Sequence, residues 1–249
     1  MRYPILNIWT DAVSLEEALT KVTEFVEQGE RPHTIFATNP EKNFSVPADP
    51  FLLKCFQQAD LLLPDGIGMV LGARILHGAK LARVPGCEFM QEICALSARR
   101  GYKVFIYGAK EEVSRAAVDI LRQRLPGLQI VGRCNGYWPE EKMDELVDKI
   151  HGSGAEILFL ALGSPKQERW FAEHREKLEN IRVCQGIGGT LDVIAGNVKR
   201  APVVFCKLGL EWLYRLLAEP KRWRRQLVLP VFAWLVLMAK VRLVVNGRR

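Results

Sequence analysis

Apolar residues recur every three or four positions near the start of the chain. Between Leu15 and Val26 they follow the spacing of one helix face, and Ser14 with Glu17 forms a capping box ahead of them. Gly29 comes after the last of them, in the place that glycine often takes just past a helix. The pattern predicts a first helix that ends before residue 29.

From residue 33 to residue 185, short apolar runs alternate with helix-spaced segments. The runs that predict strands cover residues 33–38, 61–63, 103–107, 129–131, 156–162 and 182–185. The segments that predict helices cover residues 87–100, 111–125, 140–151 and 165–174. Short strands separated by amphipathic helices imply crossover connections and a mostly parallel sheet covered on both faces. We therefore expect a doubly wound, Rossmann-like α/β domain over residues 1–198.

The pattern changes after residue 198, and residues 199–249 form a predicted C-terminal appendage. A helix over 208–217 is followed by a basic cluster at 221–225 and by the apolar residues 227–239, which Pro230 interrupts. An apolar run of this length falls short of the roughly 20 residues that a spanning helix needs. We therefore expect an interfacial or re-entrant membrane segment. The alternative is a core helix that packs on the domain or on another subunit.

Charge is distributed unevenly between these two parts. Residues 1–198 hold 23 Lys/Arg and 26 Asp/Glu, whereas residues 199–249 hold 12 and 2, so the net charges are −3 and +10. A basic cluster next to an apolar segment attracts anionic lipid at about 1 kcal/mol per Lys or Arg, and Trp223 and Trp234 suit a headgroup boundary. The combination favours a membrane over nucleic acid as the partner of the appendage.

Several kinds of site are disfavoured by the sequence. The six cysteines form no C-x-x-C pair, which favours buried reduced thiols over a disulfide framework or a zinc site. The four histidines show no paired spacing, so no metal is assigned. Neither a G-x-G-x-x-G after the first strand nor a P-loop occurs. The D-x-D motif, which holds a divalent cation on the diphosphate in many nucleotide-sugar enzymes, is also absent. No secretory signal is recognised, so we expect a cytoplasmic catalytic domain.

Polar residues follow the predicted strands at the edge where such sheets bind ligands. Asp65 lies between Pro64 and Gly66, where partial desolvation increases the basicity of a carboxylate; a turn or a helix N-cap is the alternative. Arg83 precedes a helix and suits a phosphate or a carboxylate, unless it is a solvated surface residue. Gln167 opens a helix, where it either donates to a sugar or phosphate oxygen or caps the helix.

The same positions belong to a longer series of short segments. They are Thr38-Asn39, Pro64-Asp65-Gly66, Arg83-Val84-Pro85-Gly86, Asn135-Gly136-Tyr137, Gly163-Ser164-Pro165-Lys166-Gln167-Glu168, Gly188-Gly189-Thr190-Leu191-Asp192, Lys199-Arg200-Ala201-Pro202 and Gly209-Leu210-Glu211-Trp212-Leu213-Tyr214-Arg215. In order and spacing these segments resemble the WecG/TagA/CpsF glycosyltransferase family. The resemblance spans most of the chain, and the Gly-Ser-Pro-Lys-Gln-Glu block is among its most specific parts.

The resemblance implies an inverting, metal-independent transfer of an N-acetylmannosamine-type sugar. The donor is a UDP-sugar, and the acceptor is the GlcNAc of an undecaprenyl-diphosphate-linked lipid at the cytoplasmic face of the bacterial membrane. No cofactor is implied. Members of the family build teichoic acid linkage units, enterobacterial common antigen, capsule or exopolysaccharide.

The resemblance also assigns roles to individual residues. It implies that Asp65 is the general base, with Arg83 and Gln167 beside it in the catalytic set. Thr38 and Asn39 then line the substrate pocket, and the arginines Arg215, Arg222 and Arg225 of the appendage reach the nucleotide diphosphate. The remaining substrate-binding candidates from the strand ends and matching segments are Gly108, Tyr137, Gly163, Pro165, Glu168, Gly188, Gly189 and Asp192. The glycines of 186–189 fit a plain tight turn equally well.

Other functions stay open at this point. A membrane scaffold that has lost catalysis is opposed by the intact Asp65, Arg83 and Gln167. Nucleic-acid binding through the basic appendage, with its aromatic residues stacked on bases, is opposed by the apolar run beside the charges. The donor could also carry the uronic acid form of the sugar or another hexose such as glucose. An apolar appendage that covers a neighbouring subunit leaves a homo-oligomer open.

Overall fold

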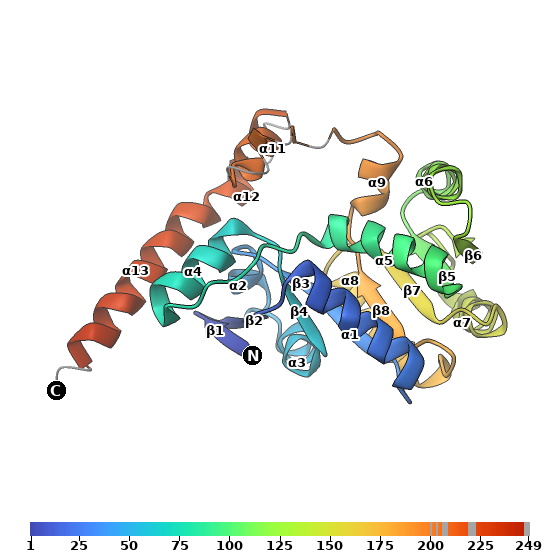
Figure 1. The fold of residues 1–249 in the computed structure, drawn as a ribbon, viewed down its shortest axis with the longest axis horizontal. Helices are drawn as coiled ribbons and strands as arrows, with labels where there is room; N and C mark the ends of the chain where they lie inside the picture. The colour runs from blue at the N-terminus through green and yellow to red at the C-terminus, as the bar shows by residue number, and fades with distance from the viewer. Residues whose placement is uncertain (200, 203, 206–208, 219–222, 247–249) are drawn as a thin grey trace.

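A six-stranded parallel sheet forms the centre of the molecule (Figure 1). The computed structural model describes residues 1–199, 201–202, 204–205, 209–218 and 223–246, apart from the side chains of residues 215, 218, 224 and 225. The strands lie in the order β4-β3-β8-β7-β5-β6, and every neighbouring pair runs parallel. The predicted doubly wound α/β fold is therefore confirmed.

Each strand of the sheet coincides with a predicted strand to within three residues at either end. The strands are β3 (His33–Thr38), β4 (Leu61–Pro64), β5 (Lys103–Gly108), β6 (Gln129–Cys134), β7 (Ile157–Ala161) and β8 (Val183–Gly186). Helices connect them, as parallel neighbours require. All their carboxyl ends consequently point to the same edge of the sheet.

Alternate side chains of the strands enter two different cores. On β5, Val104 and Ile106 pack on one face, whereas Phe105 and Tyr107 pack on the other. Because successive side chains of a strand point to opposite faces, a strand that is buried on both sides carries apolar residues without interruption. This explains why the strands appear in the sequence as short continuous apolar runs.

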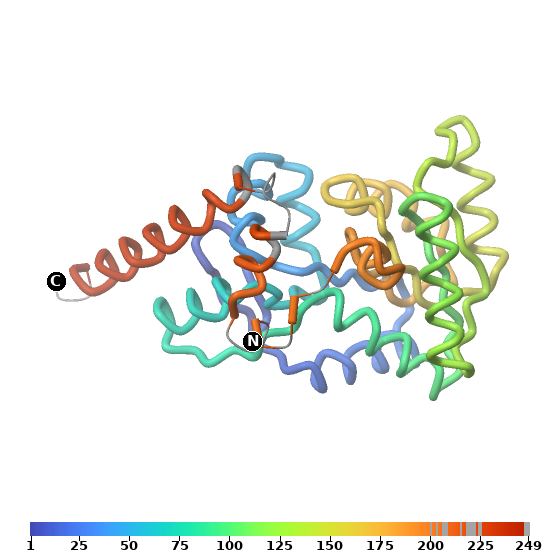
Figure 2. The backbone as a smooth tube through the Cα atoms, turned by 90° about the horizontal axis from the view of Figure 1, so that it is seen from above, coloured from blue at the N-terminus to red at the C-terminus, as the bar shows by residue number. Residues whose placement is uncertain are grey.

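Two layers of helices cover the sheet. The first core includes residues of α1 (Leu15–Gln28), α5 (Gly86–Arg100), α6 (Glu111–Arg124) and α9 (Thr190–Ile194). The opposite face is covered by α3 (Pro50–Gln58), α4 (Ile67–His77), α7 (Met143–Gly152) and α8 (Lys166–His174). Short pieces complete these connections: α2 (Lys42–Ser45), η1 (Glu140–Lys142) and η2 (Arg175–Lys177). Figures 1 and 2 show both layers from two directions.

A β-hairpin precedes the first helix and strand of the central sheet, and it was missed in the sequence. Strands β1 (Arg2–Ile5) and β2 (Ile8–Asp11) pair antiparallel around a two-residue turn in which Leu6 has a positive φ of 58°. The hairpin sequence carries none of the Asn-Gly or Asp-Gly pairs that usually mark such a turn. Ile5 and Ile8 are buried against the core that also contains α4.

The C-terminal helix differs from the prediction. In the appendage, α11 (Glu211–Ala218) and α12 (Trp223–Gln226) lead into α13 (Val228–Asn246), which is 19 residues long. By length and composition α13 is able to cross a membrane, so the expectation of a segment too short to span was wrong. Pro230 is the third residue of α13, where the backbone N–H has no intrahelical partner to lose. Lys240 and Arg242 are good helix formers and do not end it.

One side of α13 packs on α4 (Figures 1 and 2). Phe232 and Val236 are buried there, and they face two glycines on α4. A Cβ on Gly68 would lie 3.3 Å from Phe232, and one on Gly72 would lie 3.6 Å from Phe232 and 3.8 Å from Val236. Small residues four apart let two helices approach closely. The rest of α13 is largely exposed and apolar.

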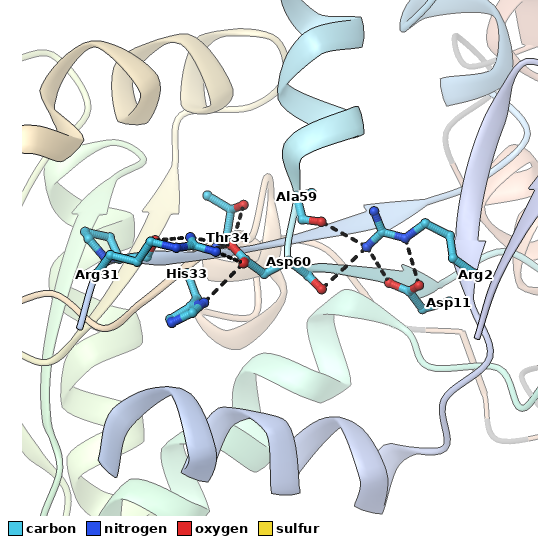
Figure 3. Close-up of polar contacts among 8 residues, drawn as sticks. Arg2, Asp11, Arg31, His33, Thr34, Ala59 and Asp60 are labelled. Atoms are coloured by element: carbon cyan, nitrogen blue, oxygen red, sulfur yellow. Dashed lines mark hydrogen bonds and ion pairs between the residues drawn. The ribbon is translucent and has the colours of Figure 1, made fainter. Parts of the chain in front are cut away.

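At the amino ends of β3 and β4, an ion-pair cluster joins these strands to the hairpin (Figure 3). Asp60 accepts from the Thr34 N–H at 2.9 Å, pairs with Arg31 and lies 3.1 Å from His33 Nδ1. Arg2 donates to the Ala59 carbonyl at 2.9 Å. Burial acts to raise the pKa of Asp60, but the hydrogen bonds from Arg31, Thr34 and His33 outweigh it and hold the pKa below its ordinary value. The cluster is far from the strand ends that carry the candidate chemistry.

Candidate active site

A cleft lies at the carboxyl ends of β3, β4 and β8, and it consists of two adjoining hollows. The sheet hollow, with a volume of about 390 Å³, is lined by residues that follow β3, β4, β7 and β8. The appendage hollow, of about 170 Å³, is lined by residues after β3 and β4 together with Gly209, Trp212, Gln226 and Leu229 of the appendage. Asn39, Glu41, Asp65 and Glu211 line both hollows. The appendage is therefore part of the wall of this cleft.

Asp65 lies where the two hollows meet. It directly follows β4, and its N–H donates to the Thr38 carbonyl at 3.1 Å, which anchors it to the end of β3. The alternative role as a helix N-cap does not apply, because Gly66 occupies the N-cap position of α4. The carboxylate of Asp65 is thus placed at the strand edge without being needed to start a helix.

Arg83 lies beside Asp65 and is not a solvated surface residue. Its Nε donates to the Asp65 carbonyl at 2.8 Å, and its Nη2 forms an ion pair with Glu211 of α11. Burial acts to lower the pKa of Arg83, but the hydrogen bond to Glu211 and the charges of Glu211 and Asp65 raise it above its ordinary value. A permanently charged guanidinium consequently faces the appendage hollow.

Gln167 occupies the sheet hollow and is almost fully buried. Its Oε1 accepts from the Gly188 N–H at 3.2 Å, and its Nε2 donates to Glu168 at 3.4 Å. The side chain passes so close to β8 that a Cβ on Gly186 would lie 2.4 Å from Nε2. Gln167 therefore does more than start α8: it connects α8 to the glycine-rich turn after β8.

Four more of the predicted residues line the cleft. Asn39 lines both hollows, and Gly188, Gly189 and Asp192 line the sheet hollow. Gly188 has a positive φ of 52°, and a Cβ on it would meet no atom within 4 Å, so its glycine serves the backbone conformation and not packing. Together with Asp65, Arg83 and Gln167, these residues form the part of the predicted site that the fold brings together.

Other predicted residues do not line either hollow. Thr38 is buried beneath the cleft, where its hydroxyl donates to the Leu63 carbonyl at 2.8 Å. Gly163 accepts from the Gln167 N–H at 2.9 Å, and Pro165 follows it in a cis peptide bond with Ser164. Glu168 is buried behind Gln167. These four positions support the site from below, and direct contact with a substrate stays a prediction for them.

Two predicted residues lie away from the cleft. Gly108 ends β5 with a φ of 130°, and a Cβ there would lie 2.4 Å from the Ala161 carbonyl carbon, so its glycine is explained by close backbone approach. Tyr137 is 73% exposed in the turn after β6. Both lie at the far end of the strand order from Asp65.

The three appendage arginines are not placed by the structure. Arg222 lies outside the described residues, and so do the side chains of Arg215 in α11 and Arg225 in α12. The proposed contact of these arginines with a diphosphate stays a prediction. The backbone of α11 nevertheless begins at the cleft, because Glu211 and Trp212 line it.

Four charged residues of the cleft were given no role in the sequence analysis: Glu41, Lys42, Lys199 and Glu211. Lys42 is in α2, four residues after β3, and lines the sheet hollow with Ser164. Glu211 lies within the Gly-Leu-Glu-Trp segment but was given no role. Closeness to the end of β3 was a usable signal for Lys42, whereas nothing in the sequence brings residue 211 to Arg83.

The lining of the cleft carries charge of both signs. Its described carboxylates are Glu41, Asp65, Asp192 and Glu211, and its described cations are Lys42, Arg83 and Lys199. Within the described part of the chain, no group of three or more His, Cys, Asp or Glu side chains is suited to hold a metal ion. The five described cysteines are free; Cys94, Cys134 and Cys184 are buried, as predicted, whereas Cys55 and Cys87 are partly exposed, and Cys206 lies outside the description.

Comparison with known proteins identifies the family. The model of the WecG/TagA/CpsF family of glycosyl transferases matches residues 3–245. The chain belongs to this family. Its segments from β1 to α13 are thus all part of the family's pattern, and the protein is a glycosyltransferase.

Two curated relatives of this glycosyltransferase share one name with each other. The chain is 34% identical over 215 residues to an N-acetylglucosaminyldiphosphoundecaprenol N-acetyl-beta-D-mannosaminyltransferase of Bacillus spizizenii, covering 86% of this chain and 82% of the relative. It is 31% identical over 225 residues to the protein of that name from Bacillus subtilis, covering 88% and 87%. Both alignments are long enough to include most of the α/β domain and part of the appendage.

Proposed function

We propose that this glycosyltransferase moves N-acetylmannosamine from a UDP-sugar to the GlcNAc of an undecaprenyl-diphosphate-linked acceptor. The two relatives are named for this acceptor and this sugar. The observation that carries the proposal is the meeting of Asp65 and Arg83 in a cleft that the appendage helps to line. A carboxylate and a guanidinium side by side suit the two demands of the reaction.

The first demand is removal of a proton from the acceptor hydroxyl. In an inverting transfer this hydroxyl attacks the anomeric carbon of the donor in one displacement, and its proton leaves to a base. We assign that base to Asp65, a role that typically contributes about 10²–10⁴-fold in rate. Its place at the junction of the two hollows gives it access to a donor in one and an acceptor in the other.

The second demand is neutralisation of the leaving nucleotide diphosphate. Arginine binds phosphate oxygens through two parallel N–H donors, and such donors stabilise charge as it develops. Arg83 is the described arginine of the cleft, and we propose that Arg215, Arg222 and Arg225 add to it from the appendage. Gln167 is assigned to the sugar, since its carboxamide lines the wider sheet hollow.

We further propose that the appendage holds the enzyme at the cytoplasmic face of the membrane. Support comes from α13, whose exposed apolar residues include Trp234, Leu237, Val241 and Val245, and from the net charge of +10 over residues 199–249. A lipid-linked acceptor then meets the cleft next to the helix that contacts lipid. The alternative is that a second subunit covers the exposed apolar face of α13.

A donor panel tests this proposal. Purified protein is incubated with a short-chain lipid-diphosphate-GlcNAc acceptor and, in separate reactions, with UDP-N-acetylmannosamine, its uronic acid form and UDP-glucose. We expect UDP release and a lengthened lipid product with the first donor. Turnover of only UDP-glucose would redirect the assignment to another hexose. Absence of UDP release with every donor would favour the scaffold alternative.

A further inference from the structure

The sheet hollow contains a cation that neither the family resemblance nor the proposed function uses. The side chain of Lys42 is only 15% exposed, its Nζ contacts Ser164 Oγ, and it lies 3.3 Å from Glu168 Oε1. The ring of Phe56 lies on another side, with its centroid 5.1 Å from Nζ. Residues of α3, of α8 and of the turn before α8 therefore fix the position of this ammonium group.

The partner of Lys42 is a carboxylate in an unusual place. The Glu168 side chain is 1% exposed, and its second oxygen, Oε2, has no hydrogen-bond partner among the described residues. A buried carboxylate is costly unless it is paired, and a buried ion pair is often no more stabilising than apolar residues of similar size. Stability alone is thus a poor reason to place Glu168 under the cleft. Orientation of a neighbouring group is a better one.

That neighbouring group is Gln167. Its carboxamide is directed by two partners: Oε1 accepts from the Gly188 N–H, and Nε2 donates to Glu168 Oε1. A carboxylate accepts hydrogen bonds and donates none, so Glu168 permits only the amide nitrogen to face it. The remaining N–H and lone pair of Gln167 are then presented to the sheet hollow in one orientation.

Lys42 also acts on a second residue of the cleft. Its backbone N–H donates to Asn39 Oδ1 at 3.1 Å, so the same residue fixes the side chain that lines both hollows. Asn39 follows β3 and Gln167 follows β7, and the end of β8 lies between those strands. Position 42 therefore contacts Asn39 through its backbone, whereas the Lys42 side chain reaches the Gln167 side of the cleft through Glu168.

We propose that Lys42 is a positioning residue for the transfer reaction. Its ammonium pins the Glu168 carboxylate, and Glu168 sets the orientation of the Gln167 carboxamide toward the donor sugar. The inference rests on the proposed role of Gln167 in sugar binding. It predicts that the Lys42–Glu168 pair affects use of the donor more than it affects the stability of the fold.

The variants are chosen so that loss of folding does not obscure the result. K42M alone leaves a buried carboxylate without its cation, so it risks unfolding. The double variant K42M/E168Q removes both charges, and K42R keeps a cation at the same place. K54M removes an exposed lysine of α3 and serves as the control. Each protein is assayed for transfer from UDP-N-acetylmannosamine and for its unfolding temperature.

We expect K42M/E168Q to keep the wild-type unfolding temperature within a few degrees and to raise KM for the donor at least tenfold. K42R is expected to recover most of that loss, and K54M to match the wild type. Wild-type kinetics in the double variant overturn the inference. A loss of activity that K42R shares in full also overturns it, because the cation then has no separate effect.

A spectroscopic measurement separates this inference from the proposed function. In protein labelled with ¹⁵N at glutamine, the side-chain amide signal of Gln167, assigned by its loss in Q167M, reports its hydrogen bond to Glu168. We expect E168Q to move that signal, whether or not any donor is turned over. An unchanged signal contradicts the positioning role. If the wild-type protein transfers no sugar from any donor, a shifted signal in E168Q keeps the role of Glu168 in orienting Gln167 and rejects the proposed reaction.

Discussion

Replacement of Phe232 by Ala is expected to release α13 from α4. Phe232 is 4% exposed, and it rests on the two α4 glycines with Val236. Burial of a phenylalanine side chain contributes about 1.5–3 kcal/mol, and the groove keeps its shape when the ring is lost because glycine has no side chain to fill it. A loss of about 2 kcal/mol lowers the equilibrium constant for docking about thirtyfold.

Hydrogen–deuterium exchange over residues 67–77 and 228–246 measures this change. We expect exchange in both segments to accelerate in F232A, by up to about thirtyfold where it proceeds through undocking. The matched control is W234A on the same helix, because Trp234 is 60% exposed. Equal exchange in F232A and W234A would show that Phe232 does not hold α13 on the domain, and the reasoning from the glycine groove would fail.

Three further predictions concern single residues. D60N is expected to lower the free energy of unfolding by about 2 kcal/mol at pH 7, since hydrogen bonds to charged groups contribute about that much. Because the pKa of Asp60 is lowered in the folded protein, the stability difference between wild type and D60N should vanish as the pH falls through the ordinary Asp value and below it. Denaturant titrations that show a constant or growing difference in acid would contradict this. E211Q is expected to tighten UDP binding about fivefold in calorimetry, since the diphosphate of UDP no longer competes with Glu211 for Arg83. Weaker UDP binding in E211Q would mean instead that Glu211 holds Arg83 in a productive position. G186A is expected to impair donor use without loss of UDP binding, because its Cβ would lie 2.4 Å from Gln167 Nε2; unchanged donor kinetics would indicate that Gln167 does not need its present position.

The strands and most of the helices of the α/β domain could be predicted because their apolar spacing is set by burial on two faces. The strand β7 is a continuous apolar run for this reason, and α1 carries both a capping box and a regular apolar stripe. The helix α4 was missed since it is apolar around most of its circumference, with glycines at 68 and 72 that usually weaken a helix. Those glycines are explained by tertiary contacts: a Cβ on Gly68 would lie 2.5 Å from Pro40 and one on Gly72 would lie 2.9 Å from Ile5, and Phe232 of α13 packs beside both.

The site was predictable where it depends on strand ends and less so where it depends on distant contacts. Asp65, Asn39 and the turn at 186–189 follow strands, and parallel strands bring their carboxyl ends to one edge. The pairs Arg83–Glu211 and Lys42–Glu168 join residues more than 100 positions apart. No local spacing encodes such pairs, so the role of Glu211 was missed, whereas Lys42 was overlooked although it follows β3 closely, and Tyr137 was included on the strength of its motif.

The length of α13 was misjudged for a physical reason that applies to other chains. Proline interrupts a helix only where it removes an intrahelical hydrogen bond, and Pro230 is too close to the start of α13 to do so. Lys240 and Arg242 interrupt an apolar run in the sequence without interrupting the helix. Counting apolar residues between such positions underestimates how far a helix extends.

The central claim is that Asp65 removes the proton of the acceptor hydroxyl in a cleft that binds the UDP-sugar. The most direct measurement compares wild type and D65N for UDP affinity by calorimetry and for sugar transfer to the lipid-linked acceptor. We predict nearly equal UDP affinity and a loss of at least 10²-fold in transfer rate for D65N. Transfer at the wild-type rate in D65N would contradict the assignment of the base and the mechanism built on it.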